Sequence, residues 1–205
     1  MPVLQPDPGS IRAVAFDLDG TLVDSRLDFP AIRAELGFPD GVGLLEHLAT
    51  LDDPEQVAWG NAVIARHEMH GAACATWMPG ANTLLERLRE HGVPTAILTR
   101  NMRPAVELVS ERLGLDVDLV LSREDCAPKP APDGLLQIAA GLAVRPVELV
   151  YVGDFLFDLQ AARAAGSVSC LYRTAENADY ATSADWVIDH FDEFAEAYLS
   201  AAGRR

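Results

Sequence analysis

The stretch Asp17-Leu18-Asp19-Gly20-Thr21-Leu22-Val23-Asp24-Ser25 directly follows a short apolar run, Arg12-Ala13-Val14-Ala15-Phe16. A near-continuous apolar run of this length is typical of a strand buried on both faces, as in a parallel sheet. Asp17 and Asp19 lie two residues apart, so an extended backbone directs both carboxylates to the same side. The sequence therefore predicts a pair of acids at the end of a buried strand.

Further apolar runs along the chain alternate with helical patterns. The runs are Pro94 to Leu98, Val117 to Leu121, Glu148 to Val152, Val168 to Tyr172 and Trp186 to Ile188. The helical stretches end at or just before a glycine, which is a common helix stop. They are Ala81 to His91, Pro104 to Leu113, Pro132 to Gly141 and Leu156 to Ala165. This alternation predicts a doubly wound α/β fold with a Rossmann-like parallel sheet.

One segment interrupts the alternation, because residues 23–78 contain no clear strand run. We expect helices there over Pro30 to Leu36, with Asp28 as the N-cap, over Val42 to Leu51, and over Pro54 to about Ala75. The prediction is a small all-helical cap at 23–78, inserted after the first strand of a core that comprises 1–22 and 79–205. Helices over a site are what a buried substrate pocket requires.

Composition limits the classes of partner. The 205 residues include 31 acidic and 16 basic side chains, a formal net charge of -15, which disfavours binding to nucleic acid or to an anionic membrane. Three cysteines without a CxxC pair, no signal pattern at the N-terminus and no apolar run of membrane length indicate a cytoplasmic protein. Both a monomer and a homodimer are compatible with the sequence.

Polar motifs follow several of the predicted strands. Thr99-Arg100-Asn101 follows the second run, Lys129 lies between two prolines, and Asp154 follows the fourth run, with Asp158 four residues further on. Ligands of an open α/β sheet bind beyond the carboxyl ends of its strands. We therefore expect these motifs and the Asp17 motif to converge on one cleft.

Charge in such a cleft calls for a metal ion. Asp17, Asp19, Asp154 and Asp158 would face a single cation, Lys129. Two like charges about 4 Å apart repel by roughly 4 kcal/mol at the dielectric of a protein surface. A bound phosphate would add to that repulsion, and hard carboxylate and phosphate oxygens are ligands that suit Mg²⁺. The sequence thus predicts Mg²⁺ as the cofactor of a phosphoryl-transfer site.

These motifs resemble the haloacid dehalogenase-like hydrolase superfamily, and within it the phosphoglycolate phosphatase-like branch with a helical cap. The resemblance extends from Arg12 to about Ile188, and the stretch DLDGTLVDS is its most specific part. It implies a phosphatase, a phosphoric monoester hydrolase, that acts on a small phosphorylated metabolite, with 2-phosphoglycolate as one candidate. The reaction would proceed through an aspartyl-phosphate intermediate.

The resemblance also implies roles for the acids and the lysine. Asp17 would be the nucleophile and a metal ligand. Asp19 would act as the general acid and base and bind the metal through its backbone carbonyl. Asp154 would bind the metal, and Asp158 would hold the metal's water shell or Lys129. Lys129 would neutralise charge on the phosphoryl group and the nucleophile.

The predicted substrate-binding set is Thr99, Arg100, Asn101 and Gly20. Thr99 would bond the phosphoryl group, and Gly20 would leave room for backbone amides to approach phosphate. Arg100, together with Arg26 and Arg33, is a candidate for binding an anion on the distal part of the substrate. Paired helical histidines such as those at 67 and 70, beside an arginine at 66, are more often surface or packing residues than ligands.

Three other functions stay open at this point. A phosphomutase acting on a sugar phosphate would share the same core motifs. A 2-haloacid dehalogenase is disfavoured by Asp19 and Asp154, because family dehalogenases lack the second aspartate and need no metal. A binding module that has lost catalysis is disfavoured because every expected catalytic side chain is present.

Overall fold

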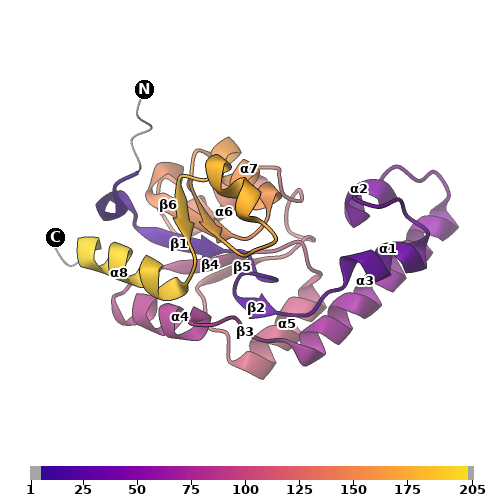
Figure 1. Cartoon of the computed structure of the whole chain (residues 1–205), viewed down its shortest axis with the longest axis horizontal. Helices are drawn as coiled ribbons and strands as arrows, with labels where there is room; N and C mark the ends of the chain where they lie inside the picture. The colour runs from indigo at the N-terminus through magenta and orange to yellow at the C-terminus, as the bar shows by residue number, and fades with distance from the viewer. Residues whose placement is uncertain (1–5, 203–205) are drawn as a thin grey trace.

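The computed structural model describes residues 6–202. Its centre is a six-stranded parallel sheet with the strand order β5-β4-β1-β6-β7-β8 (Figure 1). The predicted doubly wound α/β fold is confirmed, and each predicted strand is present within two residues of its expected ends. The strands are β1 Ala13–Phe16, β4 Thr95–Leu98, β5 Leu119–Leu121, β6 Leu149–Gly153, β7 Val168–Tyr172 and β8 Trp186–Ile188.

Helices cover both faces of this sheet. Because side chains alternate along β1, Val14 and Phe16 pack with α4, α5 and α8, whereas Ala13 and Ala15 pack with α6 and α7. Figure 1 shows these two layers below and above the sheet. The helices are α4 Ala81–Glu90, α5 Arg103–Leu113, α6 Asp133–Gly141, α7 Leu156–Ala165 and α8 Phe191–Ala202. β1 is therefore buried on both sides, as its unbroken apolar run predicted.

Helix α8 was not among the predicted elements. Its buried residues nevertheless follow the helical period, with Phe191, Phe194, Ala195, Tyr198 and Leu199 all below a tenth exposed. That spacing is the sequence signal that would have identified the helix.

The segment between β1 and α4 is mostly helical, with α1 Phe29–Leu36, α2 Leu44–Leu48 and α3 Pro54–Cys74. Asp28 caps α1 as predicted, because its side chain accepts a hydrogen bond from the backbone N–H of Ala31 at 2.9 Å. Helix α2 is shorter than predicted, since the backbone of Gly43 is extended and the helix begins only after it. In Figure 1 these helices project to one side of the sheet.

Two short strands, which the sequence analysis did not predict, connect this segment to the sheet. β2 Val23–Asp24 pairs antiparallel with β3 Thr76–Trp77. Two-residue strands are too short to produce a recognisable alternation of apolar and polar residues. Beyond them the helices have an apolar cluster of their own, formed by Ile32, Leu36, Leu44, Leu48, Val63 and Ile64. The residue boundaries of the cap at 23–78 stay a prediction.

The C-terminal part of α3 is attached to the core by polar contacts. The carboxylate of Glu68 accepts hydrogen bonds from Arg123 at 2.5 Å and from the backbone N–H of Met102 at 3.1 Å. Arg112 of α5 donates to the backbone carbonyl of Ala72 at 2.9 Å. None of the helices within residues 6–202 has both the length and the apolar character needed to cross a membrane.

Candidate active site

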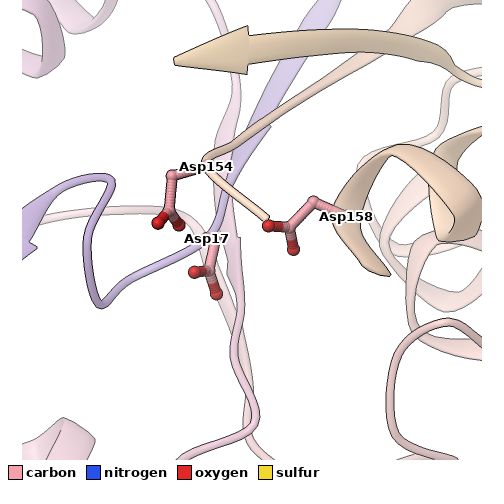
Figure 2. Close-up of side chains that lie close together, drawn as sticks. All are labelled: Asp17, Asp154 and Asp158. Carbon is pink, nitrogen blue, oxygen red and sulfur yellow. The ribbon is translucent and has the colours of Figure 1, made fainter. Parts of the chain in front are cut away.

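Three aspartates meet at the carboxyl ends of the central strands. Asp17 follows β1 directly, Asp154 follows β6 directly, and Asp158 lies in the first turn of α7. Each offers a carboxylate oxygen, and these oxygens all lie within 4.8 Å of one another (Figure 2). The β1–β6 pairing fixes this meeting point, because the backbone N–H of Asp17 also donates to the carbonyl of Val152 at 2.8 Å. The structure thus brings together side chains that are up to 141 positions apart in the sequence.

Lys129 lies between two of these acids. Its Nζ donates to Asp17 Oδ1 at 2.5 Å, to Asp158 Oδ1 at 2.6 Å and to the Tyr151 hydroxyl at 2.9 Å. The Tyr151 hydroxyl in turn donates to the backbone carbonyl of Leu98 at 2.8 Å. Lys129 is only 4% exposed, so this set of partners replaces its solvent.

Sequence reasoning missed Tyr151. The signal was present, because a tyrosine in the middle of an apolar strand run needs a hydrogen-bonding partner for its hydroxyl group when the strand is buried. Here that hydroxyl fills the space between the end of β4 and Lys129.

Asp158 is oriented by its own helix. Its Oδ2 accepts a hydrogen bond from the backbone N–H of Phe155 at 2.9 Å, which caps the N-terminus of α7. Its Oδ1 remains directed at Lys129. Gly153 makes this position accessible, since a Cβ atom there would lie 2.4 Å from the Cβ of Asp158. A glycine is therefore required five residues before Asp158, because any larger side chain would collide with Asp158 in the turn between β6 and α7.

Asp154 is held by the loop that follows β1 and by the loop that follows β7. Thr21 Oγ1 donates to Asp154 Oδ1 at 3.2 Å, and Asn177 Nδ2 donates to the backbone carbonyl of Asp154 at 2.7 Å. Gly20 has a φ of 82°, and a Cβ atom there would lie 2.6 Å from Asp154 Oδ2. The glycine therefore lets the loop approach this acid closely. Thr21 and Asn177 were not among the predicted site residues.

Asp19 lies apart from the three-carboxylate cluster but lines the same cavity. Its Oδ1 is buried and has no hydrogen-bond partner among the described residues. Burial raises the pKa of Asp19, and a hydrogen bond from Ser25 only partly offsets that effect. A raised pKa favours the protonated form, which suits a carboxyl group that donates a proton during a reaction.

The electrostatics of the cluster are unfavourable for three free carboxylates. Burial raises the pKa of Asp17 well above its usual range, and the attraction of Lys129 does not fully compensate. Burial and the charge of Asp158 raise the pKa of Asp154 to about 7. Burial alone would lower the pKa of Lys129, but the charges of Asp158 and Asp17 raise it above its usual range. Three buried acids face only one cation, Lys129, so a divalent metal ion would balance the excess negative charge. Carboxylate oxygens are the ligands that Mg²⁺ prefers, and the cluster therefore fits that ion.

Thr99 and Asn101 follow β4, and both are buried in the wall of the same cavity. Thr99 Oγ1 accepts a hydrogen bond from the backbone N–H of Asn101 at 3.1 Å, which shapes the loop between them. Arg100 extends to the cap, where its Nη2 donates to Glu46 Oε1 at 2.5 Å. The Arg100 guanidinium also lies 5.1 Å from the ring centre of Phe157.

The cavity that these residues line has a volume of about 270 Å³ and extends from the acids to the cap helices. Arg33 and Arg100 line it, whereas Arg26 is exposed and is absent from the described lining. Arg66 and His67 are also absent from that lining, and both pair with Glu35 of α1. Of the three candidates for a distal anion, two are therefore placed at the cavity.

A family model for haloacid dehalogenase-like hydrolases matches residues 11–166. That match covers most of the chain and includes the aspartates and the lysine described above. The chain belongs to this family. The resemblance that the motifs indicated is therefore confirmed.

Curated relatives agree with this assignment. The chain is 35% identical over 182 residues to a phosphoglycolate phosphatase of Chromobacterium violaceum, with coverage of 76% of this chain and 82% of the relative. It is 28% identical to an N-acetylmuramic acid 6-phosphate phosphatase of Pseudomonas aeruginosa, covering 88% and 91%. The prediction of a phosphatase, a phosphoric monoester hydrolase of the haloacid dehalogenase-like type, is confirmed by these relatives and the family match.

Solved structures show the same fold. A hydrolase from Pseudomonas syringae superposes with a TM-score of 0.74 at 22% identity, covering 90% of this chain and 98% of that one. The fold in Figure 1 is thus shared with a solved hydrolase structure of very different sequence.

Proposed function

We propose that this family member is a magnesium-dependent phosphatase that hydrolyses a small phosphomonoester through an aspartyl-phosphate at Asp17. The observation that carries the proposal is Lys129 held between Asp17 and Asp158 inside a cluster of three buried carboxylates. Asp17, Asp154 and the backbone carbonyl of Asp19 would hold Mg²⁺, with Asp158 behind them. When bound, the ion would neutralise charge on the phosphoryl oxygens and on the carboxylates.

In the first half of the reaction, a carboxylate oxygen of Asp17 forms a bond to phosphorus while the ester P–O bond breaks. The electron pair of that bond leaves with the alcohol oxygen, which takes the proton held by Asp19. Lys129 donates to Asp17 and so keeps one of its oxygens oriented during the attack. Thr99 and Asn101 would bind the phosphoryl oxygens.

In the second half, Asp19 removes a proton from water, and the water oxygen attacks phosphorus. The bond between phosphorus and the Asp17 oxygen breaks, and inorganic phosphate is released. Both enzyme carboxyl groups return to their starting protonation states. The raised pKa of Asp19 suits a group that must donate a proton in one half and accept one in the other.

For the substrate we propose only a chemical class, and for the location only a cellular compartment. A small phosphorylated metabolite is the expected partner, and 2-phosphoglycolate stays a candidate because a relative is named for that substrate. A cytoplasmic location is consistent with Cys74, Cys126 and Cys170, which are all free thiols. Whether the protein is a monomer or a homodimer stays open.

The test is phosphate release from p-nitrophenyl phosphate with Mg²⁺ and with EDTA. We expect activity with the ion and loss in EDTA. Asp17→Asn removes the nucleophile and lowers kcat at least about a thousandfold. The control is Asp24→Asn, since the Asp24 side chain is 50% exposed and lies outside the described cavity lining. Full activity of Asp17→Asn would rule out the proposed nucleophile.

Two alternatives have their own assays. Free chloride from a 2-haloacid without metal would identify a dehalogenase, and transfer of phosphate within glucose 1-phosphate would identify a phosphomutase. Asp19 and Asp154 argue against the dehalogenase, whereas the core motifs are common to phosphatases and mutases.

A further inference from the structure

The cap end of the cavity has an apolar lining. Among the described residues, the side chains that line it from the cap include only two with polar groups, Arg33 and Glu68. The other side chains there are hydrocarbon, from Leu27, Phe29, Ile32, Val42, Leu44, Leu45 and Ile64. No serine, threonine, asparagine, glutamine or histidine of the cap is part of the described lining.

Each charged group at this end makes at least one hydrogen bond within the protein. Arg33 Nε donates to the backbone carbonyl of Val42 at 2.9 Å. Glu68 accepts from Arg123 and from the backbone of Met102, and Arg100 donates to Glu46. Beyond these contacts, the described lining at the cap end offers a hydroxyl-rich organic group few polar side chains to bind.

Aromatic rings extend the apolar wall toward the core. Phe155, the N-cap residue of α7, and Phe157, in the first turn of that helix, line the same cavity as the acids. Phe29 and Phe155 are 48% and 47% exposed, although both line the cavity. Half-exposed phenylalanines at the wall of a cavity are a feature of surfaces that bind apolar ligands.

We propose that the organic part of the substrate is predominantly apolar, so that the enzyme acts on alkyl or aryl phosphomonoesters. This inference rests on the phosphatase function proposed above and specifies its substrate class. Sugar phosphates are disfavoured, because each buried hydroxyl left without a partner reduces binding by roughly tenfold or more. 2-Phosphoglycolate has no hydrocarbon chain to fill the cap end, so we expect it to be a weaker substrate than a longer alkyl phosphate. The phosphate group binds at the charged end, and the hydrocarbon group fills the cap end.

A series of ethyl, butyl and hexyl phosphate tests this inference. These esters share a primary alkoxide leaving group, so differences in kcat/KM report binding of the chain. Each buried methylene is expected to raise kcat/KM by about fourfold until the cavity is filled. 2-Phosphoglycolate and glucose 6-phosphate, measured alongside, are expected to fall below hexyl phosphate.

The possible outcomes separate the two levels of the proposal. A kcat/KM that does not change with chain length, or that is highest for 2-phosphoglycolate, overturns the apolar substrate class but leaves the phosphatase intact. Absence of phosphate release from every ester overturns the phosphatase assignment itself.

Paired variants locate the effect in the cavity. Phe29→Ser removes an aromatic ring from the lining and is expected to lower the ratio of kcat/KM for hexyl over ethyl phosphate severalfold. The matched control is Trp59→Ser, because Trp59 is 51% exposed on α3 and is not part of the described lining. Leu45→Asn, a second lining variant, should change the ratio in the same direction as Phe29→Ser. An equal change in Trp59→Ser and Phe29→Ser would overturn the assignment of the cavity.

Discussion

The two ends of the active-site cavity have opposite physical character. At the core end, buried charges face one another, and each is oriented by a strand end, a helix cap or Lys129. At the cap end, hydrocarbon side chains dominate and the few charges are bound by the protein itself. The difference suggests a division of roles between the two ends. The sheet edge supplies the charged groups for the reaction, whereas the inserted helices decide which organic group of a substrate fits.

The largest expected effect comes from removing the cation of the core end. Lys129→Met leaves Asp17 and Asp158 buried without their shared partner. We expect the free energy of unfolding in EDTA to fall by about 3–5 kcal/mol, the usual result of breaking a buried ion pair on one side. Urea titration with a fluorescence readout measures it.

The control for that variant is an ion pair at the surface. In Arg89→Met the lost pair is with Asp116, and both side chains are about two-thirds exposed. A loss below about 1 kcal/mol is expected there. Similar losses in the two variants would show that the core end is not the electrostatically demanding region inferred above.

The next effect concerns the pH dependence of the metal-free protein. The folded pKa of Asp154 is raised to about 7 from an ordinary 3.8 by burial and by Asp158. The folded state therefore binds the proton more strongly than the unfolded state. Its stabilising effect is complete below pH 4 and is lost as the pH rises from about 4 through 7, by an amount on the order of 4 kcal/mol.

Asp154→Asn sharpens this prediction. In EDTA we expect the variant to have a higher melting temperature than the wild type at pH 8 and an equal one at pH 4. Saturating Mg²⁺ should reverse the order at pH 8, because only the wild type retains the carboxylate ligand. A variant that melts below the wild type at pH 8 in EDTA would contradict the assigned repulsion. Thermal melts monitored by circular dichroism provide the comparison.

A smaller effect is expected where the cap meets the core. Glu68→Gln removes the nearer carboxylate partner of Arg123, which is only 15% exposed, and leaves it with Glu124 at 3.7 Å. The free energy of unfolding should fall by about 1–3 kcal/mol. Glu35→Gln, which alters a more exposed pair inside the cap with Arg66, should cost less than about 1 kcal/mol. Equal losses in the two variants would argue against Glu68 as the anchor of α3.

The core end could be predicted from the sequence because each of its acids has a strong local signal. Asp17 and Asp154 follow unbroken apolar runs, and parallel pairing necessarily brings such strand ends together. Gly20 and Gly153 belong to the same motifs. Glycine is needed at these two positions because they lie very close to Asp154 and Asp158, and that closeness is visible only in the structure. Roles in catalysis remain predictions until the variants are measured.

The cap end could not be predicted in the same way. Which leucines of the cap face the cavity depends on the path of the loop around Gly41 and Gly43, and no periodic signal fixes that path. Thr21 and Asn177 were missed because their roles depend on neighbours far along the chain. Side chains that act through such contacts carry little information in their own sequence surroundings.

Arg100 has a further consequence for how the two ends communicate. It adjoins Thr99 in the chain, stands over Phe157, and is bonded to Glu46 of α2. Arg100 therefore connects α2 to the chain position next to Thr99, the residue proposed to contact phosphate. By thermodynamic reciprocity, a ligand at Thr99 that favours the Arg100–Glu46 contact is itself bound more tightly whenever that contact is formed.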